Sequence, residues 1–322
     1  MQLFNALLSF PVMNINDISG FFKAISDPTR LAILQILGSG AYGVLELCDM
    51  LDVKQSGMSH HLKVLSTAGW VEKRREGNTI FYRRALGDAL SIQQQIFREL
   101  DLHPIDEAVR IQQQQIRSER LNSARRFFVE HVDEFELHQE RIVLFEHYGP
   151  EALQLLDSLD RPKQQNVLEV GPGKGEFLRA LAERFDDVTG IDISPVMLDQ
   201  AKAQVGEYNN VKFIEGSTEF LAEQNQQFDI IIYNMVLHHV PTPEGEIAQC
   251  AQLLRPGGLL IVTDLCHHDQ EWAREQCGDQ WLGFEPEELH QWANKHGFAH
   301  NQSRFLALRN GFQVQTQVYS NA

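Results

Sequence analysis

The chain has 322 residues, with 28 Lys and Arg against 44 Asp and Glu and a formal net charge of −16 at pH 7. This length suits two domains, and the acidic balance excludes a protein that coats nucleic acid nonspecifically. Four cysteines without Cys-x-x-Cys spacing exclude a disulfide framework, and no apolar run approaches the roughly 20 residues of a bilayer span, so we expect a cytoplasmic protein without a membrane partner.

Three helices are predicted near the N-terminus. The first begins at Asp27 and Pro28, because Asp27 can cap a helix and the fixed dihedral of proline suits the first helical position. A second, short helix is predicted at residues 44–51 and a third at residues 55–66, from their apolar periodicity. The spacing of these elements is typical of a helix-turn-helix.

A basic hairpin follows the helices. The runs 70–74 and 79–83 are rich in strand-forming residues and flank a turn, so they predict a β-hairpin wing. Residues 54–84 hold seven Lys or Arg against two Glu, a local net charge of +5 on an acidic chain. A basic face on these elements favours DNA as a partner.

Residues 21–84 resemble the ArsR/SmtB family of winged helix-turn-helix repressors. The resemblance is carried by Ser-Asp-Pro-Thr-Arg-Leu at 26–31 and Met-Ser-His-His-Leu-Lys-Val-Leu at 58–65. It implies a homodimer that binds operator double-stranded DNA through a recognition helix at 55–66. The residues expected to face DNA are Gln55, Ser56, Ser59, His60, Lys63, Arg74 and Arg75. A winged helix that serves only for dimerisation is the alternative.

No metal is expected. Metal-sensing members of that family carry a Cys-x-Cys pair where this chain has Cys48 alone, and the helix predicted after the wing lacks their His and acidic ligands. A later group of metal-ligand residue types is interpreted as solvated surface, because adjacent histidines point apart. Its members are His267, His268, Asp269 and Glu271.

A glycine-rich turn dominates the second half. A short apolar strand leads from Asn166 into three glycines, Gly171, Gly173 and Gly175, which allow close approach of a ligand to backbone N–H groups. The next strand ends at Asp192, an acid placed to accept hydrogen bonds from both hydroxyls of a ribose. An ordinary strand-to-helix turn is the alternative that the glycines alone leave open.

Further short apolar runs alternate with helical patterns. They lie at residues 211–214, 228–233 and 259–263, so we predict a parallel, doubly wound sheet. The expected fold class is α/β, with a winged helix before a Rossmann-like sheet domain. Residues 105–147 consist mostly of helix formers and predict a helical connector.

This half resembles class I S-adenosylmethionine-dependent methyltransferases, and a nicotinamide-binding Rossmann domain is the less favoured alternative. The resemblance rests on Glu169 before the glycines, Phe-Asp-Ile-Ile-Ile-Tyr-Asn-Met-Val-Leu-His-His-Val at 228–240 and Leu-Arg-Pro-Gly-Gly-Leu-Leu at 254–260. It implies S-adenosylmethionine or S-adenosylhomocysteine as the ligand. The implied binding residues are Glu169, Gly171, Gly173, Gly175, Asp192, Ile193, Met197, Ser217 and Asn234.

Two details of this half bear on function. Many such methyltransferases have Gly-Asp at the end of the third strand, where this chain has Ser217 after the glycine, with Glu219 as a substitute acceptor for adenine. Of His238 and His239, one is expected to line the pocket and the other to support it.

We therefore predict a DNA-binding and dimerisation domain at 1–100, a connector at 101–150 and an adenosyl-ligand domain at 151–322. The combination resembles S-adenosylhomocysteine-responsive repressors of methionine-cycle genes. One hypothesis is a repressor that senses either adenosyl ligand. The other is an active methyltransferase on a small-molecule acceptor with an attached DNA-binding domain. No catalytic residue is predicted, because methyl transfer needs mainly positioning.

Overall fold

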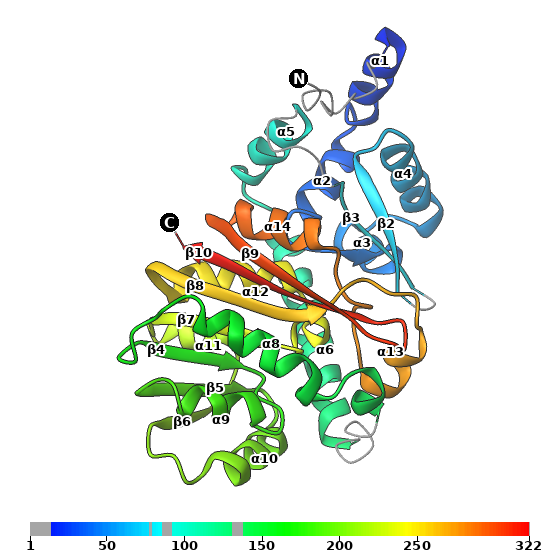
Figure 1. The fold of residues 1–322 in the computed structure, drawn as a ribbon. Helices are drawn as coiled ribbons and strands as arrows, with labels where there is room; N and C mark the ends of the chain where they lie inside the picture. Colours follow the sequence, from blue (N-terminus) through cyan, green and yellow to red (C-terminus); the bar gives the residue numbers. More distant parts are fainter. Residues whose placement is uncertain (1–13, 77–78, 86–91, 131–137, 322) are drawn as a thin grey trace. The chain divides into compact units, whose positions relative to one another are not determined.

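The computed structural model describes residues 14–76, 79–85, 92–130 and 138–321 (Figure 1). Contacts divide the chain into two units: unit 1 comprises residues 1–75 and 79–113, and unit 2 comprises residues 76–78 and 114–322. The division falls inside helix α6 (Glu107–Glu130), within the predicted connector. No helix among the described residues is long and apolar enough to span a bilayer.

Unit 1 is a winged helix, as predicted. Its elements are α1 (Ile15–Ala24), α2 (Pro28–Ile36), β1 (Tyr42–Gly43), α3 (Val44–Leu51), α4 (Gln55–Thr67), β2 (Val71–Glu76), β3 (Thr79–Arg84) and α5 (Ile92–Asp101). The side chain of Asp27 accepts the backbone N–H of Arg30 at 3.0 Å and caps α2, with Pro28 at the first helical position. The strands form a small sheet in the order β1-β3-β2.

The core of unit 1 fixes the orientation of α4. Met58, Leu62 and Leu65 are fully buried on one face of this helix, so its opposite face is left to solvent. The indole N–H of Trp70 donates to the carbonyl of Phe21 at 2.9 Å, and the two rings stack with centroids 4.1 Å apart. These contacts tie α1 to the start of the wing.

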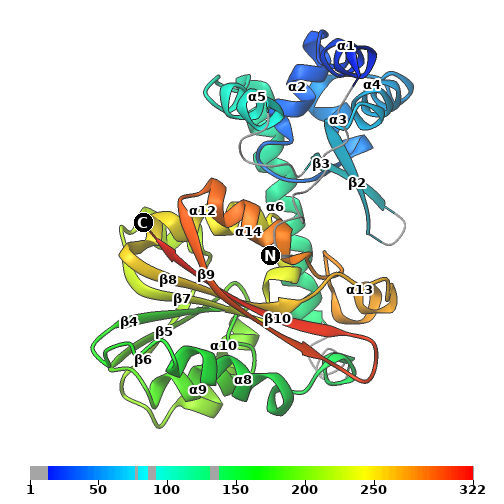
Figure 2. The same ribbon diagram turned by 45° about the horizontal axis from the view of Figure 1, so that its top comes forward.

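Unit 2 is a sheet covered by helices on both sides. After α6 its elements are α8 (Phe145–Asp157), β4 (Asn166–Val170), α9 (Glu176–Ala182), β5 (Asp187–Asp192), α10 (Pro195–Val205), β6 (Val211–Glu215), α11 (Thr218–Glu223), β7 (Phe228–Asn234), the 3-10 helix η1 (Leu237–His239), α12 (Pro243–Leu253), β8 (Leu254–Leu265), α13 (Trp272–Cys277), α14 (Pro286–Lys295), β9 (Phe298–Ala307) and β10 (Gln313–Asn321). The sheet order is β6-β5-β4-β7-β8-β10-β9. Helices α8 and α9 lie on one side of it, and α12 and α14 on the other (Figure 2).

The five predicted strands pair in parallel, as expected, and two strands that were not predicted make the whole sheet mixed. Strands β4 to β8 pair in parallel, but β10 pairs antiparallel with both β8 and β9. A tight turn joins β9 to β10, where the N–H of Leu308 donates to the carbonyl of Phe312 at 2.9 Å. Such a short connection can join only antiparallel strands.

Candidate functional site

A cavity of about 370 Å³ lies at the carboxyl ends of the parallel strands. Its wall includes Val170 at the end of β4, Asp192 at the end of β5 and Asn234 at the end of β7. The chain winds from β4 outward to β6 in one direction and from β7 outward in the other. Open sheets of this kind bind ligands where the winding direction changes.

The predicted glycine turn forms one wall of the cavity. Gly171 and Gly173 line it, with φ of 66° and 54°. A Cβ at Gly171 would clash with Val236, whereas the position of a Cβ at Gly173 has nothing within 4 Å. Gly175 lies outside the lining: it caps α9 with φ of 86°, and a Cβ there would lie 3.0 Å from the backbone of Ala201. The absence of a side chain at Gly175 thus allows α9 to pack closely against α10.

Two buried carboxyl groups line the cavity. Glu169 is 1% exposed, burial raises its pKa to about 8, and its Oε2 has no hydrogen-bond partner among the described residues. Burial also raises the pKa of Asp192 to about 6, against the effect of the Ser194 N–H that donates to Oδ1 at 2.8 Å. Buried acceptors with unused capacity suit a ligand rich in N–H and O–H donors, and an adenosyl amino acid is one.

The remaining predicted ligand residues also line the cavity. They are Ile193, Met197, Ser217 and Asn234. The Ser217 hydroxyl accepts the N–H of Phe220 at 3.4 Å and caps α11, while Glu219 is exposed and outside the lining. The structure therefore gives Glu219 no part in this site.

Met235 marks a strained point in the cavity wall. Its φ is 57°, a left-handed conformation that costs a non-glycine residue about 1–3 kcal/mol. The backbone N–H donates to the carbonyl of Thr263 at 2.8 Å, which holds the turn after β7 in place. Such strain is concentrated at ligand sites.

The two adjacent histidines divide their roles as predicted. His239 lines the cavity, and His238 lies behind it with Nδ1 2.7 Å from Asp264 Oδ1. Burial lowers the pKa of His238, but the carboxylates of Asp264 and Asp279 outweigh it and raise the pKa to about 9. Burial, together with the charge on His238, holds the pKa of His239 well below its usual value.

The interpretation of residues 267–271 as solvated surface is wrong for one residue. His268 is 8% exposed, and its ring packs edge-on against Phe312 with centroids 4.6 Å apart. Adjacent side chains point apart, so His267 and Asp269 are exposed while His268 joins the core.

Most of the predicted DNA-facing residues are exposed. They are Gln55, Ser56, Ser59, His60 and Lys63 on α4 and Arg75 on β2. Arg74 is 9% exposed, which corrects its assignment, because adjacent strand residues face opposite sides. Part of the local positive charge is neutralised within unit 1, where Arg83 pairs with Glu72 at 3.1 Å and Arg84 with Asp101 at 2.7 Å.

Comparison with known protein families supports the resemblances noted for both halves of the sequence. Residues 143–315, more than half of the chain, match the family described as "Methyltransferase domain". The chain belongs to this methyltransferase family. Residues 27–73 match the family described as "Bacterial regulatory protein, arsR family". The molecule thus fuses an ArsR-family helix-turn-helix to a Rossmann-like methyltransferase domain.

Two curated relatives and one solved structure are similar to this methyltransferase domain. A ubiquinone biosynthesis O-methyltransferase of Coxiella burnetii is 30% identical over 190 residues, which cover 54% of this chain and 81% of the relative. One of the same name from Saccharophagus degradans is 29% identical over 164 residues, covering 46% and 70%. A methyltransferase solved in complex with the Haloferax volcanii Trm112 methyltransferase activator shares the fold, with a TM-score of 0.50, 17% identity and coverage of 61% and 96%.

Sequence reasoning missed several residues of this site. Phe128 from α6 and Tyr148 from α8 line the cavity, and Asp264 and Asp279 lie behind the histidines. Asp264 precedes the last residue of β8, so the rule that identified Asp192 at a strand end could have found it.

Proposed function

We propose that this protein is a DNA-binding transcriptional regulator, a homodimeric cytoplasmic repressor whose methyltransferase domain binds S-adenosylmethionine or S-adenosylhomocysteine as effector. The ArsR-family match and the exposed polar face of α4 support the DNA-binding half. The operator is double-stranded DNA, read by α4 in the major groove. Genes of the methionine and methyl cycle are the expected targets.

The observation that carries this proposal is the course of α6. Near its start, Gln113 Nε2 donates to Ser39 Oγ at 2.9 Å within unit 1. Near its end, Leu121, Ala124 and Phe128 line the cavity of unit 2. One continuous helix therefore holds residues of both units. A ligand that contacts the end of α6 can bias the conformation of the whole helix, and with it the DNA-binding half.

The chemistry of the cavity supports the ligand class. Glu169, Asp192 and Asn234 offer acceptors for amino and hydroxyl groups. The open space at Gly173 allows a ligand to approach the backbone at the start of α9, where N–H groups point outward. Either adenosyl ligand suits these features, and the two differ by one methyl group and the sulfonium charge.

A second candidate function is methyl transfer to the hydroxyl of a small molecule. It is favoured by the curated relatives, which are named O-methyltransferases. The cavity wall also includes Phe128, Tyr148 and His239, beyond the residues assigned to the adenosyl ligand. These side chains offer an aromatic surface for an acceptor.

The two adenosyl ligands are expected to change operator affinity by different factors. Useful allosteric coupling is about 1–3 kcal/mol, or roughly 5- to 150-fold in affinity, and by reciprocity the operator must change ligand affinity equally. Fluorescence anisotropy with a genomic fragment from beside the gene, at constant salt and with each ligand in turn, measures this. If neither ligand moved the isotherm while the protein consumed S-adenosylmethionine in a cell extract, the enzyme function would replace the regulator.

The role of α6 can be tested apart from either binding site. Ser118→Pro removes a backbone donor in the middle of this exposed helix segment and costs the helix about 3 kcal/mol or more. We expect ligand binding and operator binding to persist, with their mutual effect falling towards none. Ser118→Ala, which keeps the helix, is the matched control. Full coupling in the proline variant would show that the signal bypasses α6.

A further inference from the structure

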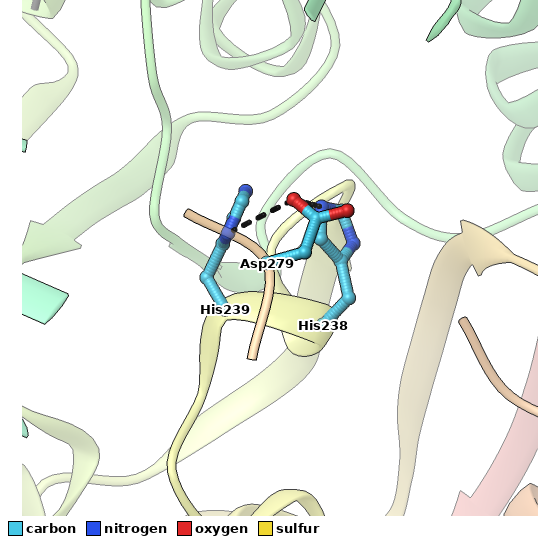
Figure 3. Close-up of side chains that lie close together, drawn as sticks. All are labelled: His238, His239 and Asp279. Carbon is cyan, nitrogen blue, oxygen red and sulfur yellow. Dashed lines mark ion pairs between the residues drawn. The ribbon is translucent and has the colours of Figure 1, made fainter. Parts of the chain in front are cut away.

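Three buried side chains converge at the cavity wall: His238 and His239 from η1, and Asp279 just after α13. Figure 3 shows both imidazole rings beside the Asp279 carboxyl group. Asp279 Oδ1 lies 3.8 Å from His238 Nε2 and 3.7 Å from His239 Nδ1. Gly278 ends α13 with a φ of 72°, and this turn directs the next residue, Asp279, towards the two histidines.

The carboxyl group of Asp279 is buried without a hydrogen bond. The residue is 2% exposed, and neither of its oxygens has a hydrogen-bond partner among the described residues. Leaving such a group without a compensating partner costs several kcal/mol, so a native fold retains it only for a reason. The imidazole nitrogens of His238 and His239 are too distant from Asp279 Oδ1 for hydrogen bonds but leave room for an ion between them.

We propose that His238, His239 and Asp279 form a binding site for a divalent transition-metal ion in the wall of the cavity. Two imidazoles and one carboxylate are a ligand set found in zinc enzymes and in non-haem iron enzymes. Hard cations such as Mg²⁺ and Ca²⁺ prefer oxygen ligands and are disfavoured here. This inference does not depend on the proposed regulatory function, and it replaces the expectation that no metal binds.

The distances fit an ion after a small adjustment. The three candidate ligand atoms lie within 4.8 Å of one another. Metal–ligand distances of about 2.0–2.2 Å place neighbouring ligand atoms roughly 3.0–3.6 Å apart, so the site must contract on binding. His239 Nδ1 also lies 3.4 Å from the Gly278 carbonyl, a long contact that this nitrogen gives up when it binds the ion.

Asp264 supplies the outer support that metal-binding histidines usually have. Its Oδ1 lies 2.7 Å from His238 Nδ1, and its carboxylate also accepts the backbone N–H of Leu265 at 2.7 Å. This contact fixes a proton on Nδ1 and makes Nε2, the nitrogen that faces Asp279, the metal ligand, which gives up its own proton when the ion binds. A dication also balances two buried carboxylates, those of Asp264 and Asp279.

The site adjoins the space where an adenosyl ligand and any acceptor would lie. His239 lines the cavity, so an ion beside it can be reached from there. Three protein ligands leave a fourth position open, as in catalytic zinc sites. The class of ligand for that position is a small molecule with an oxygen donor, or water.

The test is direct metal binding by the tag-free, full-length protein after chelator treatment. We expect one Zn²⁺ per chain in competition with a chromophoric chelator, and a Co²⁺ visible spectrum that Zn²⁺ removes. Asp279→Asn and His239→Ala should each weaken Zn²⁺ binding at least 100-fold. Asp264→Asn, which alters only the outer support, should weaken it about 10- to 100-fold.

His267→Ala is the matched control, because His267 belongs to an exposed histidine–aspartate pair, 3.9 Å from Asp269, outside the proposed site. It should bind Zn²⁺ like the wild type. Circular dichroism confirms that each variant folds. Wild-type protein that bound no Zn²⁺ or Co²⁺ at micromolar concentrations would overturn the proposal, and so would folded Asp279→Asn protein that bound as tightly as the wild type.

Discussion

Gly173→Val is expected to abolish binding of both S-adenosylmethionine and S-adenosylhomocysteine, with at least a 100-fold loss of affinity. Gly173 lines the cavity, and nothing lies within 4 Å of the position where its Cβ would be. A branched side chain would therefore occupy space that the ligand needs. Isothermal titration calorimetry with each ligand measures the loss. Operator binding by the ligand-free protein should survive, since the helix-turn-helix lies in unit 1.

Gly257→Val is the control that distinguishes the two effects of Gly173→Val, the strain in the backbone and the exclusion of the ligand. Gly257 has φ of 74°, also with nothing within 4 Å of a Cβ, but lies outside the cavity lining. Valine in this conformation costs about 1–3 kcal/mol of stability at either position. Both variants should thus lose similar thermal stability, while only Gly173→Val loses ligand. Normal ligand affinity in folded Gly173→Val protein would remove the glycine turn from the binding site.

The elements of unit 1 were predictable because their signals are local. Asp27 and Pro28 start α2 where a cap and a first-turn proline indicate it. Met58 and Leu62, four residues apart, identify the buried face of α4. The last two strands of unit 2 were not predicted, because β10 carries polar residues in its buried centre, such as Gln315 and Gln317. The side chains of Gln315 and Gln317 find hydrogen-bond partners only in the folded protein, where Gln315 donates to the carbonyl of Phe284 and Gln317 donates to Gln315.

The residues of the candidate site also fall into those that the sequence could place and those that it could not. Asp192 and Asn234 follow strands whose ends must meet at one edge of the sheet, so the pattern of strands suffices to place them together. Asp279 and Tyr148 come from segments whose path no strand pattern defines. The position of Asp279 depends on the turn at Gly278, so only the structure brings it to the histidines.

Lys63→Ala and Arg75→Ala are each expected to weaken operator binding and to flatten its salt dependence. Both residues are exposed, Lys63 on the proposed recognition helix and Arg75 on the wing. Each phosphate contact on B-DNA contributes about 0.9 to the slope of log affinity against log salt, so its loss costs roughly tenfold at about 0.1 M salt. A homodimer loses two contacts per substitution, which doubles the change in slope.

Lys202→Ala controls for the loss of a charge by itself. Lys202 is an exposed lysine of unit 2, paired with Asp199 at 3.1 Å, and its removal should leave the salt slope unchanged. Anisotropy titrations across a salt series compare the three variants, and ligand affinity of the free protein should stay constant in all of them. If Lys63→Ala and Arg75→Ala both kept the wild-type slope, α4 and the wing would not be the DNA-binding face, and the winged helix would be left with dimerisation as its role.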